Sequence, residues 1–203
     1  MKAEHVIATY ERVGAEWARM RARNLMEKAW LDRMLAASPR ATGKVRVLDL
    51  GCGSGRPIGT YLTDRGAALT GVEPTKSLGA LYAQNLPDAQ VIAADMRRLR
   101  LDQAFDAIIA WDSFFHLSAD DQRDMFPVFA AHAAPRATLM FTSGHLAGEA
   151  IGQVGDAPIY HASLAPDAYQ ALLTQHDFKV LRYTPEDPDC GGHTGWLAQY
   201  QGD

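Results

Sequence analysis

The chain has 203 residues, of which 47% are hydrophobic and 22% are charged, with a formal net charge of −4. This composition suits one globular domain with a full core, and its slightly acidic balance gives no overall attraction to nucleic acid or anionic membranes. Two distant cysteines argue against a disulfide framework, and no signal-peptide pattern or long apolar run indicates secretion or membrane spanning. We therefore expect a single cytoplasmic domain over residues 1–203.

Residues 1–40 are expected to form an N-terminal helical cap. Apolar side chains recur there at intervals of four and three, which places them on one stripe of a helix. These are Val6, Tyr10, Val13, Trp17 and Met20. A second helix is expected over residues 25–35, and both helices are expected to pack on the sheet edge. The basic residues of this region, expected on a solvated helix face, are Arg19, Arg21, Arg23 and Lys28.

Residues 45–57 read VRVLDLGCGSGRP, an apolar run that ends in Asp49 and then breaks into alternate glycines. Such a break predicts a buried strand that turns sharply into a helix. Glycine permits positive φ and lets another molecule approach the main chain, and Pro57 suits the first position of the helix. The turn is therefore predicted to bind a ligand through Gly51, Gly53 and Gly55.

The spacing of these glycines excludes two common ligand loops. The dinucleotide fingerprint needs glycine at its first, third and sixth positions, and the sixth position counted from Gly51 is Arg56. No Gly-Lys-Ser or Gly-Lys-Thr follows, so the phosphate-binding P-loop is also absent. A carboxylate at Asp49 would repel phosphate and suits a cationic ligand. The D-x-G-x-G-x-G pattern instead resembles the class I S-adenosylmethionine-dependent methyltransferases, which implies that Asp49 lies near the methionine end of that cofactor.

Two further runs extend the resemblance. Residues 68–73 are strand-like and end in Glu73, and an acid at this place in doubly wound folds accepts hydrogen bonds from ribose hydroxyls. Residues 91–96 form a third buried run. In the resembled family an acid here accepts the adenine amino group while its neighbour packs on the ring, which implies these roles for Asp95 and Met96.

A fourth run, residues 105–111, is apolar except for Asp106, as expected for the central strand of a covered parallel sheet. It leads into a polar and aromatic cluster, residues 111–116, and open α/β sheets bind ligands at the carboxyl ends of their strands. Aromatic walls there would favour a sulfonium cation, and we expect Trp111, Ser113 and His116 at the site. The complete set of expected cofactor-binding residues is Asp49, Gly51, Cys52, Gly53, Gly55, Glu73, Pro74, Asp95, Met96 and Trp111.

The remaining sequence alternates between helix and strand and ends in a hairpin. The expected helices are 119–133, which contains Pro127, and 167–176, and the expected strands are 137–142, 178–183 and 194–200. We expect residues 143–153 and 157–164 to be loops on the acceptor side. The predicted fold is α/β: a Rossmann-like, doubly wound, seven-stranded sheet over residues 45–203, mostly parallel with an antiparallel C-terminal hairpin, preceded by the N-terminal helices.

The resemblance implies methyl transfer from S-adenosylmethionine to an oxygen or nitrogen of a small molecule. In many small members of the resembled family the N-terminal helices also cover the cofactor, which implies that role for Tyr10, Trp17 or Trp30. Sulfonium is an activated leaving group, so positioning and water exclusion would supply most of the acceleration. A base is needed only if the acceptor arrives protonated. His116 is the candidate, because the ordinary histidine pKa of about 6.5 suits the task, and Tyr160 and His193 are weaker substrate-side choices. The histidines show no short paired spacing, so we assign no metal.

Two alternative functions stay open at this point. A non-catalytic protein could keep the pocket for S-adenosylmethionine or S-adenosylhomocysteine without transferring the methyl group. A short-chain nicotinamide oxidoreductase would need a Tyr-x-x-x-Lys pair, and no tyrosine of the chain has lysine four residues later. The sequence predicts a small-molecule partner and leaves the acceptor and the oligomeric state open.

Overall fold

The computed structural model describes residues 1–20, 24–40 and 43–202, so Arg21 and Arg23 of the basic cluster lie outside the described residues. The strands are β1 Arg46–Leu50, β2 Ala68–Val72, β3 Gln90–Ile92, β4 Phe105–Ala110, β5 Ala133–Ser143, β6 Gly148–Val154, β7 Ala157–Ser163, β8 Phe178–Asp187 and β9 His193–Tyr200. The helices are α1 Val6–Met20, α2 Lys28–Ala37, α3 Ile58–Asp64, α4 Lys76–Asn85, α5 Ala119–His132 and α6 Pro166–Gln175. Short 3-10 turns are η1 Ala3–His5, η2 Met96–Arg98, η3 Phe114–His116 and η4 Pro188–Cys190.

The main sheet has seven strands in the order β3-β2-β1-β4-β5-β9-β8. Strands β1 to β5 pair in parallel, whereas β9 pairs antiparallel with both β5 and β8. The predicted fold class is thereby confirmed, including the antiparallel C-terminal hairpin. The order reverses between β1 and β4, and the carboxyl ends of these strands are where an open α/β sheet binds its ligand.

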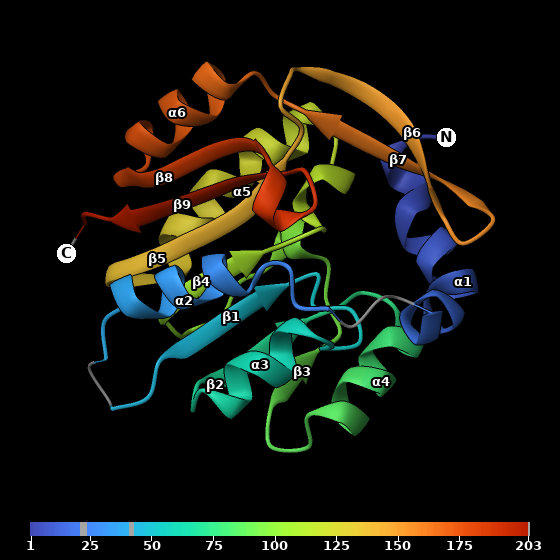
Figure 1. Ribbon diagram of the computed structural model, residues 1–203, viewed down its shortest axis with the longest axis horizontal. Helices are drawn as coiled ribbons and strands as arrows, with labels where there is room; N and C mark the ends of the chain where they lie inside the picture. The colour runs from blue at the N-terminus through green and yellow to red at the C-terminus, as the bar shows by residue number, and fades with distance from the viewer. Residues whose placement is uncertain (21–23, 41–42, 203) are drawn as a thin grey trace.

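Different helices cover the two faces of the sheet (Figure 1). Leu48, Ile108 and Leu139 share one apolar cluster with the buried faces of α5 and α6. Their neighbours in the strands, such as Val47 and Met140, point to the other face, into a cluster with α2 and α3. Continuous apolar strands covered on both faces are typical of parallel sheets, which is why runs 45–50 and 105–111 were readable in the sequence.

Residues 148–163 form a hairpin where the sequence analysis expected loops. β6 and β7 pair antiparallel from Gly148 opposite Ser163 to Val154 opposite Ala157, outside the main sheet. The two-residue Gly155-Asp156 turn, with Gly155 at φ 58°, is a hairpin signal that the analysis missed. Apolar side chains of the hairpin pack against those of α1. The hairpin and α1 lie together beside the carboxyl edge of the main sheet (Figure 1).

The third strand is shorter than predicted. β3 ends at Ile92, and Asp95, expected at its end, instead caps η2 by accepting the backbone N–H of Arg97 at 3.0 Å. Among the strands of the described residues β3 pairs only with β2, so no second neighbour there extends its ladder. Within the described ranges, no helix combines the length and apolar composition that a bilayer crossing needs.

Asp106, the single acid within the central strand, is fully buried. Its carboxylate accepts the backbone N–H of Arg46 at 2.9 Å and two guanidinium N–H groups of the same residue at 3.0 and 2.8 Å. These charge-assisted bonds tie β4 to β1 and explain how an acid is tolerated in the core.

Asp106→Asn is expected to lower the free energy of unfolding by about 1–2 kcal/mol, because the amide offers one acceptor where the carboxylate offers two. Urea denaturation measures this change. Asp102→Asn is the matched control: Asp102 is exposed, and its substitution should cost less than about 0.5 kcal/mol. Equal stability of the two variants would contradict the role of Asp106.

Candidate functional site

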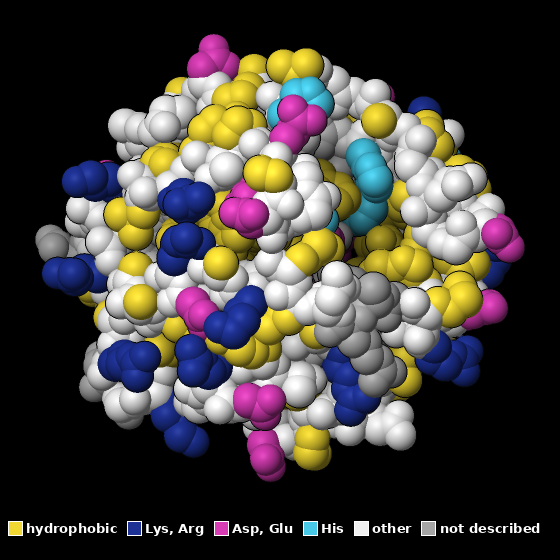
Figure 2. Space-filling view, in the orientation of Figure 1, with side chains coloured by type: hydrophobic (Ala, Val, Ile, Leu, Met, Phe, Trp, Pro, Cys, Tyr) yellow, Lys and Arg dark blue, Asp and Glu magenta, His cyan; other side chains and the backbone are white. Residues whose placement is uncertain are grey.

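A cavity of about 1050 Å³, its open mouth included, lies at the carboxyl ends of β1, β2 and β4. All ten residues expected to bind the cofactor line it, together with Tyr10, Trp17, Asp112, Ser113 and His116. Figure 2 shows a hollow on this face whose wall includes hydrophobic and histidine side chains. Trp30, which was considered as a cover, lies elsewhere: it is 1% exposed in the core and donates its indole N–H to Asp187 at 2.9 Å.

The three glycines of the loop have different surroundings. All have positive φ: 72° at Gly51, 55° at Gly53 and 74° at Gly55. A Cβ atom on Gly51 would lie 2.4 Å from Cβ of Ser113, and one on Gly55 would lie 2.7 Å from Leu86. A Cβ on Gly53 would have no atom within 4 Å. Gly51 and Gly55 are therefore needed for packing, whereas Gly53 leaves bare main chain open to the cavity.

Glu73 ties the glycine loop to the end of β2. One carboxylate oxygen accepts the backbone N–H of Gly53 at 3.0 Å, and the other accepts the backbone N–H and hydroxyl of Thr75 at 2.9 and 2.8 Å. Burial raises the pKa of Glu73, and these hydrogen bonds oppose the rise. Burial, with the nearby carboxylates of Asp49 and Glu73, also raises the pKa of the Cys52 thiol well above its ordinary value, which disfavours a thiolate nucleophile.

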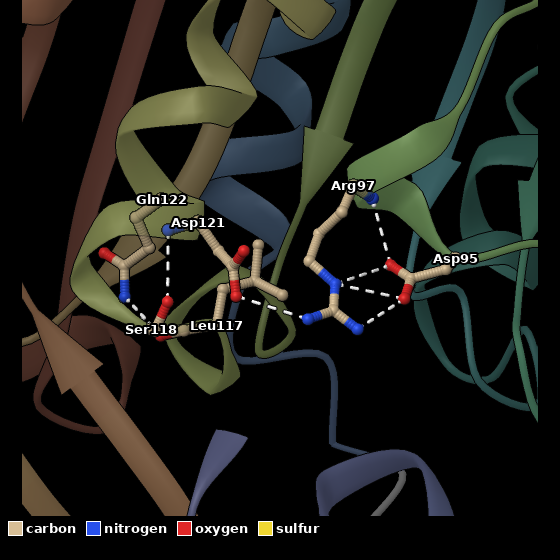
Figure 3. Close-up of polar contacts among 6 residues, drawn as sticks. All are labelled: Asp95, Arg97, Leu117, Ser118, Asp121 and Gln122. Carbon is tan, nitrogen blue, oxygen red and sulfur yellow. Dashed lines mark hydrogen bonds and ion pairs between the residues drawn. The ribbon is translucent and has the colours of Figure 1, made fainter. Parts of the chain in front are cut away.

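Asp95 lines the cavity as part of an ion-pair network (Figure 3). Arg97 donates to both carboxylate oxygens of Asp95, with its Nη2 at 2.5 Å, and also reaches Asp121 of α5 at 3.2 Å. The sequence predicts solvent exposure or local ion pairing for the arginines around position 97. Arg97 forms ion pairs with Asp95 and Asp121. Since Asp121 lies at the start of α5 and donates its N–H to Ser118, Arg97 connects the expected adenine acid to that helix.

Asp112 lies two residues after the end of β4 and was not among the expected site residues. It has a positive φ of 52°, uncommon outside glycine, and its carboxylate lies 3.0 Å from Nε2 of His193. The other ring nitrogen of His193 donates to the carbonyl of Cys190 at 2.7 Å, and the ring stacks on Trp111. Both ring nitrogens thus face acceptors, which favours the charged imidazolium, and the hydrogen bond to Asp112 raises the pKa of His193.

The ion pair between His193 and Asp112 predicts a pH-dependent stability. Because the folded-state pKa of His193 is raised above its ordinary 6.5, the stabilisation should be complete below that value and lost as the pH rises through the folded-state pKa. We expect His193→Gln to cost about 1 kcal/mol near pH 6 and less near pH 9, measured by urea denaturation. The difference should vanish in an Asp112→Asn background, and its persistence there would exclude this pair as the cause.

His116 has both ring nitrogens engaged. Nε2 lies 3.0 Å from the hydroxyl of Tyr10, and Nδ1 lies 2.9 Å from the carbonyl of Tyr160, so Nδ1 donates and Nε2 accepts in the neutral ring. Burial lowers the pKa of His116 to about 4. This value corrects the expectation of an ordinary pKa, because the ring is 7% exposed where the sequence gave no sign of burial.

The other two expected catalytic residues do not line the cavity. The hydroxyl of Tyr160 donates to Glu149 at 2.8 Å, and burial raises the pKa of Tyr160 to about 12. His193 forms the ion pair with Asp112 that is described above. Among residues 1–20, 24–40 and 43–202, no group of three or more His, Cys, Asp or Glu side chains is arranged to hold a metal ion.

The residues fit a nucleoside cofactor that carries positive charge. The open main chain of Gly53 and the buried side chains of Asp49 and Glu73 line the same cavity. The indole N–H of Trp111 is buried with no partner among the described residues, so a bound molecule could satisfy it. Carboxylates at this place disfavour a diphosphate.

Comparisons with known proteins agree with this geometry. A family model described as "Methyltransferase domain" matches residues 47–136. Trans-aconitate 2-methyltransferase of Klebsiella pneumoniae (strain 342) is 38% identical over 96 residues, which are 46% of this chain and 36% of the relative. The match therefore spans only about a third of the length of the curated relatives.

Solved structures share the fold at low sequence identity. An amino pentose methyltransferase from Micromonospora echinaspora with bound S-adenosylmethionine is similar with a TM-score of 0.68 at 19% identity, covering 89% of this chain and 92% of that one. The magnesium protoporphyrin IX methyltransferase from Synechocystis PCC 6803, also with bound S-adenosylmethionine, gives a TM-score of 0.70 at 16% identity and covers 95% and 94%.

Proposed function

We propose that this chain, which is a class I S-adenosylmethionine-dependent methyltransferase, transfers the methyl group to an oxygen or nitrogen atom of a small molecule. The cofactor is S-adenosylmethionine, which the similar solved structures hold bound. The observation that carries the proposal is the open main chain at Gly53 beside two buried carboxylates. The curated relatives are named for trans-aconitate. They match less than half of this chain, so we do not assign their acceptor to it.

The residues that would hold the cofactor are distributed over three strand ends. Gly53 would lie against it, Glu73 would accept hydrogen bonds from the ribose hydroxyls, and Asp95 would accept the adenine amino group with Met96 on the ring. When bound, S-adenosylmethionine supplies a methyl group on a positively charged sulfur, which is already an activated leaving group.

The N-terminal helix completes the cavity. Tyr10 and Trp17 of α1 line it, and Tyr10 is held at His116 by the hydrogen bond described above. These aromatic side chains would exclude water and favour a cation. We therefore propose that the helices of residues 1–40 and the body of residues 45–203 act as one catalytic unit. Two unpaired cysteines, Cys52 and Cys190, fit the reducing conditions of the cytoplasm.

Isothermal titration with S-adenosylhomocysteine tests the cofactor proposal. We expect saturable binding at one site, and no binding of NADH under the same conditions. Folded protein that gives no heat with millimolar S-adenosylhomocysteine, or that binds NADH instead, would contradict the proposal. Transfer of a labelled methyl group to a metabolite extract then separates an enzyme from a non-catalytic binding protein.

A further inference from the structure

Three histidines and one carboxylate meet where the hairpin β6–β7 approaches the end of β4. Asp112 interacts electrostatically with each of the three rings: it raises the pKa of His193 and partly opposes the lowering of the pKa that burial causes at His116 and His161. These four residues, here termed the histidine cluster, are Asp112, His116, His161 and His193. Asp112 and His116 line the cavity, and the ring of His161 lies next to that of His116, just outside this lining.

The three imidazoles differ in their hydrogen bonds. Both nitrogens of His116 are engaged by Tyr10 and the Tyr160 carbonyl, and both nitrogens of His193 face Asp112 and the Cys190 carbonyl. No hydrogen bond from the described part of the chain reaches the ring of His161. His161 is therefore the member of the cluster whose ring can exchange a proton with a bound molecule without breaking a contact.

The structure holds the ring of His161 in place without using its nitrogens. The ring lies 4.9 Å from His116 and 4.9 Å from Phe115, centroid to centroid. On the opposite strand, a Cβ on Gly152 would lie 2.7 Å from Cε1 of His161, so only glycine leaves room for the ring. Partial burial lowers the pKa of His161 and Asp112 opposes this shift, which keeps the ring neutral at neutral pH.

We propose that the methyl acceptor presents an amino or hydroxyl group to His161, and that His161 takes the proton which this group loses. The proposal rests on the proposed methyl transfer and adds the class of acceptor. A carboxylate acceptor has no proton to lose and would be repelled by Asp112, whereas an N–H or O–H group can donate to the free imidazole.

The proton and electron balance of the step is complete. The acceptor nitrogen or oxygen gives its lone pair to the methyl carbon, the carbon–sulfur bond breaks, and its electron pair leaves a neutral thioether. The acceptor proton moves to a ring nitrogen of His161. Because His161 is only half-buried, the imidazolium can return this proton to solvent.

The first experiment follows a labelled methyl group from S-adenosylmethionine into a metabolite extract. We expect label that mild alkali does not release as methanol, since methyl amines and ethers are stable under conditions that cleave methyl esters. Alkali-labile label would overturn the proposal and leave methyl transfer intact. No transfer by protein that binds S-adenosylhomocysteine would contradict the proposed function itself.

The matched variants are His161→Gln and His145→Gln. Glutamine keeps hydrogen-bonding capacity but cannot take a proton, so we expect His161→Gln to slow transfer by about 10²- to 10⁴-fold. Its affinity for S-adenosylhomocysteine should stay within about twofold of the parent, because His161 does not line the cofactor cavity. His145 is exposed outside the cluster, and His145→Gln should transfer at the parent rate. Parent activity in His161→Gln would overturn the proposal.

A spectroscopic readout tests the proposal without turnover. In the full chain with ¹⁵N-labelled histidine and bound S-adenosylhomocysteine, we expect the His161 ring to titrate while His116 stays in one neutral tautomer. The titratable and charged groups around His161 are Asp112 and His116 beside it and the Tyr160–Glu149 pair on the hairpin. A His161 ring fixed in one tautomer over the whole pH range would overturn the proposal, whether or not His161→Gln folds.

Discussion

Replacing Gly53 with alanine is expected to weaken binding of S-adenosylhomocysteine by about tenfold or more, which corresponds to about 1.4 kcal/mol. The Cβ would enter space that no protein atom occupies within 4 Å, and this is the space where the bound molecule should touch the main chain. The backbone stays in place, because the N–H of Gly53 still donates to Glu73. Positive φ alone should cost about 1–2 kcal/mol of folding stability. Titration calorimetry and urea denaturation measure the two effects separately.

Gly51→Ala provides the contrast within the same loop. Its Cβ would lie 2.4 Å from Cβ of Ser113, and Ser113 is held by its hydroxyl, which donates to the Leu50 carbonyl at 2.6 Å. We expect this variant to lose about 3–5 kcal/mol of unfolding free energy from strain and overpacking together. If Gly53→Ala bound S-adenosylhomocysteine like the parent while Gly51→Ala unfolded, the open space at Gly53 would not be the cofactor site.

The parts of the fold that depend on local pattern were predictable. The run ending at Asp49 and the glycines after it specify a strand, a turn and a helix whatever the rest of the molecule does. The position of Glu73 at the end of the second strand was predictable from the same kind of local pattern. The hairpin β6–β7 was missed although Gly155-Asp156 signals it, because Gly148 and Gly152 weaken the strand pattern. A larger residue at position 152 would clash with the ring of His161, which fills the space that a Cβ there would need.

The parts of the site that depend on tertiary contact were not predictable. Asp112 and His193 come from strands far apart in the sequence, and the pairing of β5 with β9 brings them within 3.0 Å. The low pKa of His116 arises from burial under α1 and β7, which no local pattern encodes. The sequence therefore indicated where the cavity lies, but it did not indicate which histidine keeps a free ring.

Arg97→Met is expected to reduce the affinity for S-adenosylhomocysteine by about 10- to 100-fold, equivalent to about 1.4–2.7 kcal/mol. Arg97 holds both oxygens of Asp95 in one orientation and joins them to Asp121 (Figure 3). Methionine keeps the length and apolar contacts of the side chain without its charge. Asp95 would then lose the orientation that we propose for binding the adenine amino group. Arg100→Met, at an exposed position nearby, is the matched control and should bind like the parent.

The pH dependence of binding separates loss of orientation from loss of fold. Partial burial raises the pKa of Asp95, but the hydrogen bonds from Arg97 outweigh it and hold this pKa below its ordinary 3.8. The parent should therefore bind S-adenosylhomocysteine equally well from about pH 8 to pH 5. In Arg97→Met the guanidinium is lost, and the backbone N–H of residue 97 and the charge of Arg98 are left to oppose burial. The pKa of Asp95 should then be higher than in the parent, so the affinity of Arg97→Met should fall further as the pH is lowered from about 8 to about 5. A variant with the affinity of the parent, or one whose weakened binding is the same at every pH, would show that Arg97 does not act through the Asp95 carboxylate.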